Sequence, residues 1–201
     1  MRSRWTSCAL ALFCALAPAG GATAEENRGK TPTADEAAAR YFTDTELVDQ
    51  GGKPRHFYSD LLRGKKVLIN FGFTSCKGVC PTMTANLARV QKLLGARVGS
   101  EIVMITLSVD PVNDTPAVLD RFAKKFGVGP GWYFLTGTPG DVKTVLGRVG
   151  GLVKKPEEHS AVLLVGDLKT GFWVKSLATA RPEDIVYLVD HLNDEKTARA
   201  P

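Results

Sequence analysis

Residues 66–94 read KVLINFGFTSCKGVCPTMTANLARVQKLL, and the order of patterns within this stretch decides the fold. Residues 66–73 form a short apolar run with a β-branched centre, which is typical of a buried strand. Apolar residues then recur at helical spacing from Met83 to Leu94 and predict a helix with one apolar face. A buried strand that leads directly into such a helix indicates an α/β fold.

The flanking sequence extends this unit in both directions. Gly51-Gly52 lies between two short strand-like runs and predicts a hairpin. After the first helix, apolar runs alternate with helical patterns, and a second hairpin precedes a last helix that opens at Pro182. The other expected elements are strands at 102–109 and 132–135, helices that open at Thr115-Pro116 and Thr138-Pro139, and a hairpin of 161–165 with 171–174.

The helix that opens at Thr115 should turn Val118, Phe122 and Phe126 toward the core, because these residues recur at helical spacing. Asp114 and Thr115 are residues of the kind that cap helix N-termini, so we expect both to cap this helix.

The order of these elements predicts an α/β fold with a thioredoxin-like mixed sheet flanked by helices. A strand–helix–strand unit followed by strand–strand–helix is the thioredoxin-like arrangement, here with an N-terminal β-hairpin and a helix–strand–helix insertion. We expect this domain to span residues 42–194, after a flexible lead-in at 25–41 and before a polar tail at 195–201.

The composition excludes several classes of protein. Hydrophobic residues make up 44% and charged residues 23% of the 201 residues, which argues against disorder throughout and against a polytopic membrane protein. The net charge is +5, and no long basic run indicates a nucleic-acid partner.

Residues 1–24 are expected to be a secretory signal peptide. They contain Arg2 and Arg4, an apolar run at 9–17, and Ala22-Thr23-Ala24 before Glu25. The alternative is an uncleaved N-terminal membrane anchor. Cleavage would remove two of the four cysteines and would place the protein in an oxidising compartment, the periplasm.

Cys76 and Cys80 remain, at the point where the buried strand ends and the helix begins. Ligands usually bind at the carboxyl ends of strands in α/β sheets, and a helix N-terminus stabilises a thiolate. On a helix, residues four apart share one face, so both sulfurs would reach a single soft metal ion. A structural disulfide is the main alternative, but closing so small a loop removes little unfolded-state entropy. A functional dithiol is therefore favoured.

Three histidines are candidates for a further ligand. We expect His56, in the early hairpin, and His191, in the last helix, to be ordinary surface or packing residues. His159 stands directly before the strand that begins at Ala161, in the loop where thioredoxins place a proline against their dithiol. Two thiolates and an imidazole suit copper, whereas zinc, which accepts the same ligands, usually takes a fourth.

Four segments together resemble the SCO/SenC family of copper chaperones for cytochrome c oxidase assembly. They are FGFTSCKGVCPTM (71–83), TLSVDPVNDTPAVL (106–119), WYFLTGT (132–138) and EEHSAVLLVGD (157–167).

The resemblance extends over about residues 42–191 and implies that copper, as Cu(I), Cu(II) or both, is bound by Cys76, Cys80 and His159. It also implies a role at the binuclear copper centre of cytochrome c oxidase subunit II, either delivery of copper or reduction of the cysteines. Asp110 matches the family as well, but we expect it to be structural and not a metal ligand.

The chain departs from the family pattern beside two of the expected ligands. Family members often have Pro-Asp after the first cysteine, where this chain has Lys77-Gly78, and often Asp before the histidine, where it has Glu158. The cation of Lys77 favours thiolates and repels a copper ion.

The main hypothesis is therefore a periplasmic metallochaperone, for which a thiol–disulfide reductase activity stays open. Its expected partners are oxidase subunit II, other copper chaperones and a thioredoxin-like reductant. A thiol–disulfide oxidoreductase that uses Cys76 and Cys80 as nucleophile and resolving thiol is the alternative, and a peroxidase-like enzyme is a third hypothesis. His159 distinguishes them, because a metal site needs it and dithiol exchange does not. After export we expect a Cys76–Cys80 disulfide, with copper binding only after reduction.

Overall fold

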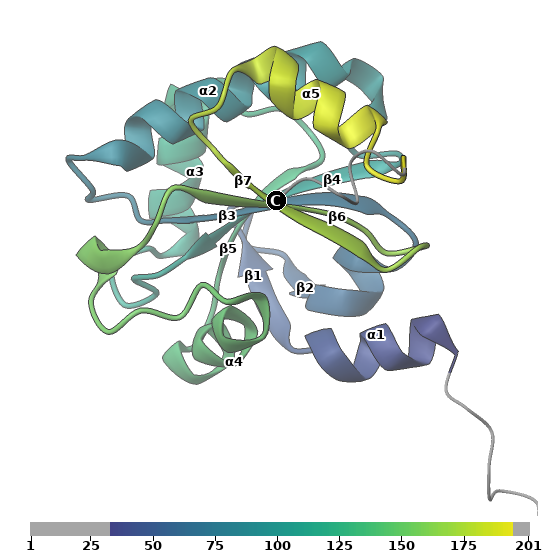
Figure 1. Ribbon diagram of the computed structural model, residues 1–201. Coiled ribbons are helices and arrows are strands. Elements are labelled where there is room, and N and C mark those ends of the chain that lie inside the picture. The colour runs from purple at the N-terminus through teal and green to yellow at the C-terminus, as the bar shows by residue number, and fades with distance from the viewer. Residues whose placement is uncertain (1–32, 195–201) are drawn as a thin grey trace, which may run out of the picture. The chain divides into compact units, whose positions relative to one another are not determined.

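The computed structural model describes residues 33–194 (Figure 1), so the expected signal peptide at 1–24 and the tail at 195–201 lie outside the described residues. The described strands form one seven-stranded sheet in the order β2-β1-β5-β4-β3-β6-β7. The strands are β1 (Glu46–Asp49), β2 (Pro54–His56), β3 (Lys66–Gly72), β4 (Ile102–Ser108), β5 (Trp132–Thr136), β6 (Val162–Asp167) and β7 (Phe172–Leu177). The helices are α1 (Ala34–Phe42), α2 (Val79–Leu94), α3 (Pro116–Lys125), α4 (Pro139–Val149) and α5 (Pro182–Asp190), with short helical turns η1 (Phe57–Leu62), η2 (Gly95–Arg97) and η3 (Pro156–Glu158).

Helices cover both faces of this sheet. Helices α2 and α5 lie against each other on one face, and α1 and α4 lie together on the other (Figure 1). Strand β3 pairs with β4, and β4 with β5, in parallel, while the remaining pairs are antiparallel. The predicted thioredoxin-like mixed sheet is confirmed, with hairpin β1–β2 before it and α3–β5–α4 inserted between β4 and β6. Within residues 33–194, no helix is both long enough and apolar enough to cross a bilayer.

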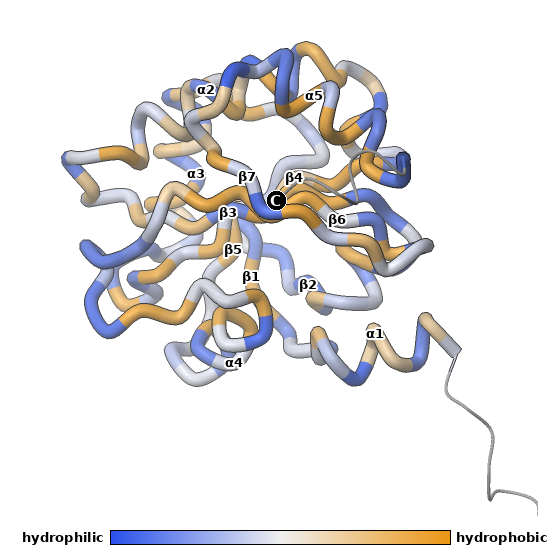
Figure 2. Tube along the Cα trace, viewed as in Figure 1, coloured by the Kyte–Doolittle hydropathy of each residue, from blue (hydrophilic) through white to orange (hydrophobic). Residues whose placement is uncertain are grey.

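The two central strands end level with each other. Their register pairs Lys66 with Ile102 at one end and Gly72 with Ser108 at the other. Both strands are buried along almost their whole length, which is why their sequences are nearly continuous apolar runs, seen as hydrophobic colour in the middle of Figure 2. The backbone N–H of Val109 then donates to the carbonyl of Gly72 at 3.0 Å. The loops that follow β3 and β4 therefore leave the sheet at the same edge.

The helical faces of α2, α4 and α5 agree with the sequence periodicity. Burial of each large apolar side chain contributes about 1.5–3 kcal/mol, so these faces fix the helices on the sheet. The buried residues are Met83, Leu87, Val90 and Leu94 in α2, Val142, Val145, Leu146 and Val149 in α4, and Ile185 and Val189 in α5.

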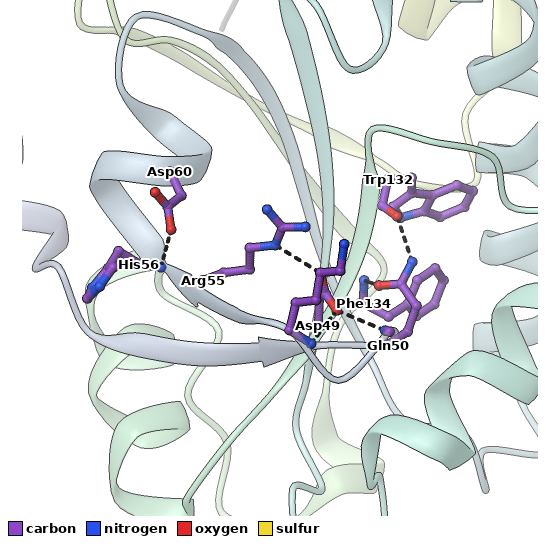
Figure 3. Close-up of polar contacts among 9 residues, drawn as sticks. Asp49, Gln50, Arg55, His56, Asp60, Trp132 and Phe134 are labelled. Atoms are coloured by element: carbon purple, nitrogen blue, oxygen red, sulfur yellow. Dashed lines mark hydrogen bonds and ion pairs between the residues drawn. The ribbon is translucent and has the colours of Figure 1, made fainter.

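A buried carboxylate holds the turn of the predicted N-terminal hairpin (Figure 3). Asp49 is 4% exposed and accepts hydrogen bonds from the backbone N–H groups of Gly51 and Lys53, at 2.8 and 3.0 Å. The Nε of Arg55 donates to its second oxygen at 2.9 Å. Because the carboxylate is fully paired with donors, its burial is compatible with a stable fold.

The side chain of Gln50 joins the hairpin to β5 (Figure 3). Its Nε2 donates to the carbonyl of Trp132 at 3.0 Å, and its Oε1 accepts from the N–H of Phe134 at 2.9 Å. The amide thus continues the β1–β5 pairing by the same bonds that a backbone peptide would make.

The expectation of a flexible lead-in at 25–41 is wrong for residues 34–41, which form most of helix α1. Thr33 and Glu36 form a reciprocal capping box at its N-terminus. At the other end Phe42, 7% exposed, packs against Trp173 with ring centroids 5.3 Å apart. The alanines that resemble a linker therefore belong to a helix held by its two ends; residues 25–32 lie outside the described part.

Two expectations about α3 are wrong in part, although Thr115 is the N-cap residue of the helix as expected. Its buried residues are Leu119 and Ala123, while Val118, Phe122 and Phe126 are only partly buried. Phe122 nevertheless packs against the core, with its ring centroid 6.0 Å from that of Phe134 in β5. The side chain of Thr115 makes no capping hydrogen bond, and Asp114 has a different role, described below.

Candidate metal centre

The turn between β3 and α2 carries the first cysteine. The backbone N–H of Cys76 donates to the carbonyl of Phe73 at 3.3 Å. The chain therefore reverses direction before the helix begins at Val79. Cys80 is the second residue of α2. The spacing of the two cysteines predicted that they share a helical face. This prediction is wrong, because Cys76 precedes the helix. It is the turn that brings the two sulfurs together.

His159 approaches both sulfurs from the loop before β6. Its Nε2 lies 3.0 Å from the Sγ of Cys80 and 4.0 Å from the Sγ of Cys76. The three candidate ligand atoms all lie within 4.8 Å of one another. The Nδ1 of His159 lies 3.3 Å from the carbonyl of Ser160, which can accept only from an Nδ1–H. That tautomer leaves the lone pair on Nε2 directed at the sulfurs.

The imidazole is held neutral and in a fixed orientation. Burial lowers the pKa of His159, and this effect outweighs the carbonyl of Ser160, which raises it. The ring meets the edge of Phe73 at an interplanar angle of 89°, with centroids 5.5 Å apart. A neutral, oriented imidazole is the form that ligates a metal ion.

The two thiols differ in their readiness to ionise. Burial alone would raise the pKa of Cys76, but hydrogen bonds from the Cys80 thiol and from the N–H groups of Cys80, Gly78 and Val79 hold that pKa below its ordinary value. Burial, and then donation to Cys76, raise the pKa of Cys80 to about 12. The unpaired N–H groups at the start of α2 thus stabilise the thiolate of Cys76, as the sequence predicted.

The cluster is open to solvent at Cys76 and His159 and closed at Cys80. Cys76 is partly exposed, whereas Cys80 is 2% exposed. A surface pocket at Cys76 is lined by Phe73, Ser75, Cys76, Lys77, Gly78, Val79, Glu157 and His159. The donor set of two thiolates and one imidazole fits a soft ion such as Cu(I) without a fourth ligand. Both cysteines are free thiols here, and the disulfide expected after export remains a prediction.

Asp114 supports the cysteine turn, and the sequence reasoning missed this role. Its carboxylate is 0% exposed and accepts from the N–H of Thr74 at 3.1 Å and from the Oγ1 of Thr74 at 2.5 Å. The Oγ of Ser108 donates to its other oxygen at 2.6 Å. The carboxylate thus joins the end of β4 to a residue two positions before Cys76.

A signal for this contact is present in the sequence. Thr74 and Ser108 are polar residues at the ends of two apolar runs, and the ends of adjacent parallel strands meet at one edge of a sheet. Such a pair needs a shared partner if it is buried, and Asp114, six residues after Ser108, supplies it.

The other candidates lie outside the cluster. Within residues 33–194 the group of possible metal ligands contains only the two cysteines and His159. The carboxylate of Asp110 accepts two hydrogen bonds from Asn113, at 3.0 and 2.9 Å. His56 is exposed, and its N–H donates to Asp60 (Figure 3). His191 stacks on Tyr187 at a centroid distance of 4.0 Å. All three therefore have local structural contacts.

A thioredoxin-like sheet that carries a Cys-x-x-x-Cys turn opposite a histidine defines a class of proteins with a dithiol–imidazole site. Residues 33–166 match the model of the family described as SCO1/SenC. The chain belongs to this family, and the resemblance noted from the sequence is confirmed.

Individual relatives agree with this assignment. The SCO2-like protein of Rickettsia prowazekii is 40% identical over 100 residues, which cover 50% of this chain and 46% of that protein. The SCO1 protein homolog of Bacillus subtilis is 37% identical over 105 residues, 51% of this chain and 54% of that protein. The chain thus spans about half the length of the curated relatives that it matches.

Solved structures share the fold over a larger part of the chain. A SCO1/SenC family lipoprotein from Bacillus anthracis has a TM-score of 0.63 and 30% identity, with 74% of this chain and 92% of that chain covered. Bradyrhizobium japonicum ScoI, solved with copper bound, has a TM-score of 0.61 and 28% identity, with 73% and 96% covered.

Proposed function

We propose that this protein is a copper-binding metallochaperone that delivers copper to the binuclear copper centre of cytochrome c oxidase subunit II. The observation that carries the proposal is the convergence of Cys76, Cys80 and His159 within 4.8 Å. The copper-bound relative from Bradyrhizobium japonicum supports the choice of metal.

The three ligands have unequal access, which suits transfer of a metal ion. Cys80 is buried in α2, while Cys76 and His159 line the open pocket. An incoming thiolate of a partner can therefore replace Cys76 first, because an exposed ligand on a turn is displaced more easily than a buried one on a helix. Copper then leaves by exchange of one ligand at a time.

Anaerobic titration of the reduced protein with Cu(I), in competition with a chelator of known affinity, tests the site. We expect one copper per chain, and a large loss of affinity in Cys76→Ser and Cys80→Ser. His159→Ala should bind weakly, because two thiolates alone still hold Cu(I). The matched control is His56→Ala, an exposed histidine away from the cluster. Unchanged affinity in the cysteine variants contradicts the proposal.

A thiol–disulfide reductase is the second candidate, and the difference in exposure between the two thiols favours it. The partly exposed Cys76 would attack a partner disulfide and form a mixed disulfide, releasing one partner thiolate. The thiol of Cys80 would then lose its proton and attack the sulfur of Cys76, releasing the second partner thiolate. The partner ends as a dithiol and this protein as a disulfide, which a thioredoxin-like reductant would reduce again.

Oxidase assembly in cells that carry His159→Ala separates the two candidates. If delivery is the function, this strain should fail to assemble active oxidase at low copper. Thiol exchange depends on thiolate character and access, which the start of α2 supplies without the imidazole. Normal assembly with His159→Ala, together with failure in Cys76→Ser, would establish the reductase and reject the metallochaperone.

We also propose that the protein works in the periplasm, exported by a cleaved signal peptide at residues 1–24, with a membrane anchor as the alternative. Other copper chaperones are the proposed source of its copper. Fractionation of cells and the N-terminal sequence of the recovered protein test the location: recovery only in membranes, with Met1 retained, would favour the anchor.

A further inference from the structure

An apolar groove lies beside the metal-site loops and has no role in the proposed chemistry. One wall is formed by the loop after β4, and the other by α4 and the loop that follows it. Its apolar lining consists of Val109, Val112, Val142, Leu146, Leu152 and Val153.

Two of these side chains are unusually exposed. Val112 is 73% exposed and Leu152 is 51% exposed, whereas Val142 and Leu146 at the bottom are 1% and 4% exposed. Single exposed apolar residues are ordinary, but two that face one groove with an apolar bottom form a continuous patch. A patch of this kind with a polar rim is typical of a protein–protein contact.

The charged rim of the groove is basic. Lys143 and Lys154 line it and are exposed, and neither ammonium has an ion-pair partner within residues 33–194. The one acid in the lining, Asp110, accepts hydrogen bonds from Asn113 on its own loop. The rim therefore complements carboxylates on a partner.

Both walls are tied to the residues that carry the candidate ligands. On one side, the N–H of Asp110 donates to the Oγ of Ser108 at 3.0 Å, and Ser108 is linked through Asp114 to Thr74. On the other side, Leu152 and Lys154 belong to the loop that runs on to His159.

Gly151 fixes the start of that second loop. A Cβ at this position would lie 2.2 Å from the Cε1 of Phe71, so only glycine lets the backbone rest on the ring of β3. A protein seated in the groove would contact the loop that leads to His159 and the loop that Ser108 and Asp114 link to the cysteine turn.

We propose that this groove docks the protein that receives copper from the site, oxidase subunit II. The docked surface of that partner would present an apolar side chain surrounded by carboxylates. The inference rests on the proposed function for the identity of the partner, not for the existence of the surface. A protein is the occupant because the exposed Val112 and Leu152, with lysines on the rim, form the kind of patch that contacts another protein.

The test uses the reduced, metal-free full chain and the soluble copper-binding domain of oxidase subunit II from the same organism. Calorimetry gives the dissociation constant for the wild type, for Leu152→Asp and for Lys154→Glu. Leu152→Asp should weaken binding by about tenfold or more, since central apolar contacts dominate such interfaces. Lys154→Glu should weaken it at low salt and less at high salt.

The controls are Leu93→Asp, 54% exposed on α2, and Lys169→Glu in the exposed β6–β7 turn. Both should bind as the wild type does. All variants should keep one Cu(I) per chain, so a loss of docking is separable from a failure of the metal site. Equal affinities in all variants, or no binding by the wild type, would overturn the inference. A dimer of this chain that Leu152→Asp abolishes would assign the groove to a second copy and would also overturn it.

Discussion

Replacement of Asp114 by Asn should loosen the cysteine turn while leaving every candidate ligand in place. The wild-type carboxylate is fully buried and accepts hydrogen bonds from three donors, the N–H and hydroxyl of Thr74 and the hydroxyl of Ser108. Asn keeps one acceptor oxygen for Thr74, but its NH2 group faces Ser108, whose hydroxyl then loses the carboxylate oxygen to which it donates.

The expected loss of stability follows from these contacts. Hydrogen bonds to a charged group contribute about 1.5–3 kcal/mol each, and neutral ones about 0.5–1.5 kcal/mol. Replacing the carboxylate by an amide therefore weakens each bond, but it also removes the cost of burying a charge. We expect a net loss of about 1–3 kcal/mol in the free energy of unfolding. For a domain of this size each kcal/mol lowers the melting temperature by about 2–4 °C. Because Thr74 lies two residues before Cys76, the Cu(I) affinity should fall as well, with the stoichiometry unchanged.

Urea unfolding of the reduced, metal-free protein and chelator competition for Cu(I) measure the two effects. The matched control is Asp110→Asn, since among the described residues that carboxylate accepts only from Asn113. Its loss should change stability by less than about 0.5 kcal/mol. If Asp114→Asn unfolds at the same urea concentration as the wild type, or binds Cu(I) with the same affinity, the reasoning about this carboxylate is refuted.

Three further predictions concern single features of the chain. Iodoacetamide should modify Cys76 before Cys80 in the reduced, metal-free protein at pH 7, because the pKa of Cys76 is lowered and that of Cys80 is raised to about 12; peptide mapping that finds Cys80 modified first contradicts this. Gly151→Ala should destabilise the protein by about 1–3 kcal/mol in thermal unfolding, because its Cβ would overlap Phe71, whereas Gly147→Ala, with open space around the new methyl group, should not. The exported protein should have the mass of a chain that begins at Glu25, and a mass that includes residues 1–24 would reject cleavage.

The elements that the sequence predicts well are those that its hydrophobic pattern determines. The runs at β3 and β4 and the helical spacing in α2 reflect burial directly, and burial decides where these elements pack. Helix α1 was not predicted because alanine and polar residues carry little periodic signal. Its position depends on the capping box at Thr33 and on the distant ring of Trp173. Such a contact across the fold cannot be read from local composition.

The sequence predicts which residues form the candidate site but not how the turn before α2 arranges them. Cys76, Cys80 and His159 are the residue types that bind soft metals, and the order of the elements placed them at one edge. A spacing of four residues is compatible both with a shared helical face and with the turn that precedes α2, so the spacing alone does not distinguish them. Asp114 was read as a cap because Asp before Thr-Pro is typical of one, and only the level ends of β3 and β4 reveal its contacts with Thr74 and Ser108.

Copper transfer and thiol exchange have the same structural requirement. Both need one solvent-accessible sulfur beside a second sulfur that is buried. Cys76 meets the first condition through its position on a turn, and Cys80 meets the second through its place in α2. The two chemistries differ in what the third group must do. A resolving thiol needs no imidazole, yet the Nε2 of His159 lies 3.0 Å from the buried sulfur with its lone pair directed at it. An imidazole held in that tautomer and kept neutral by burial is arranged as a ligand, and this is why copper binding takes precedence over reduction in the proposal.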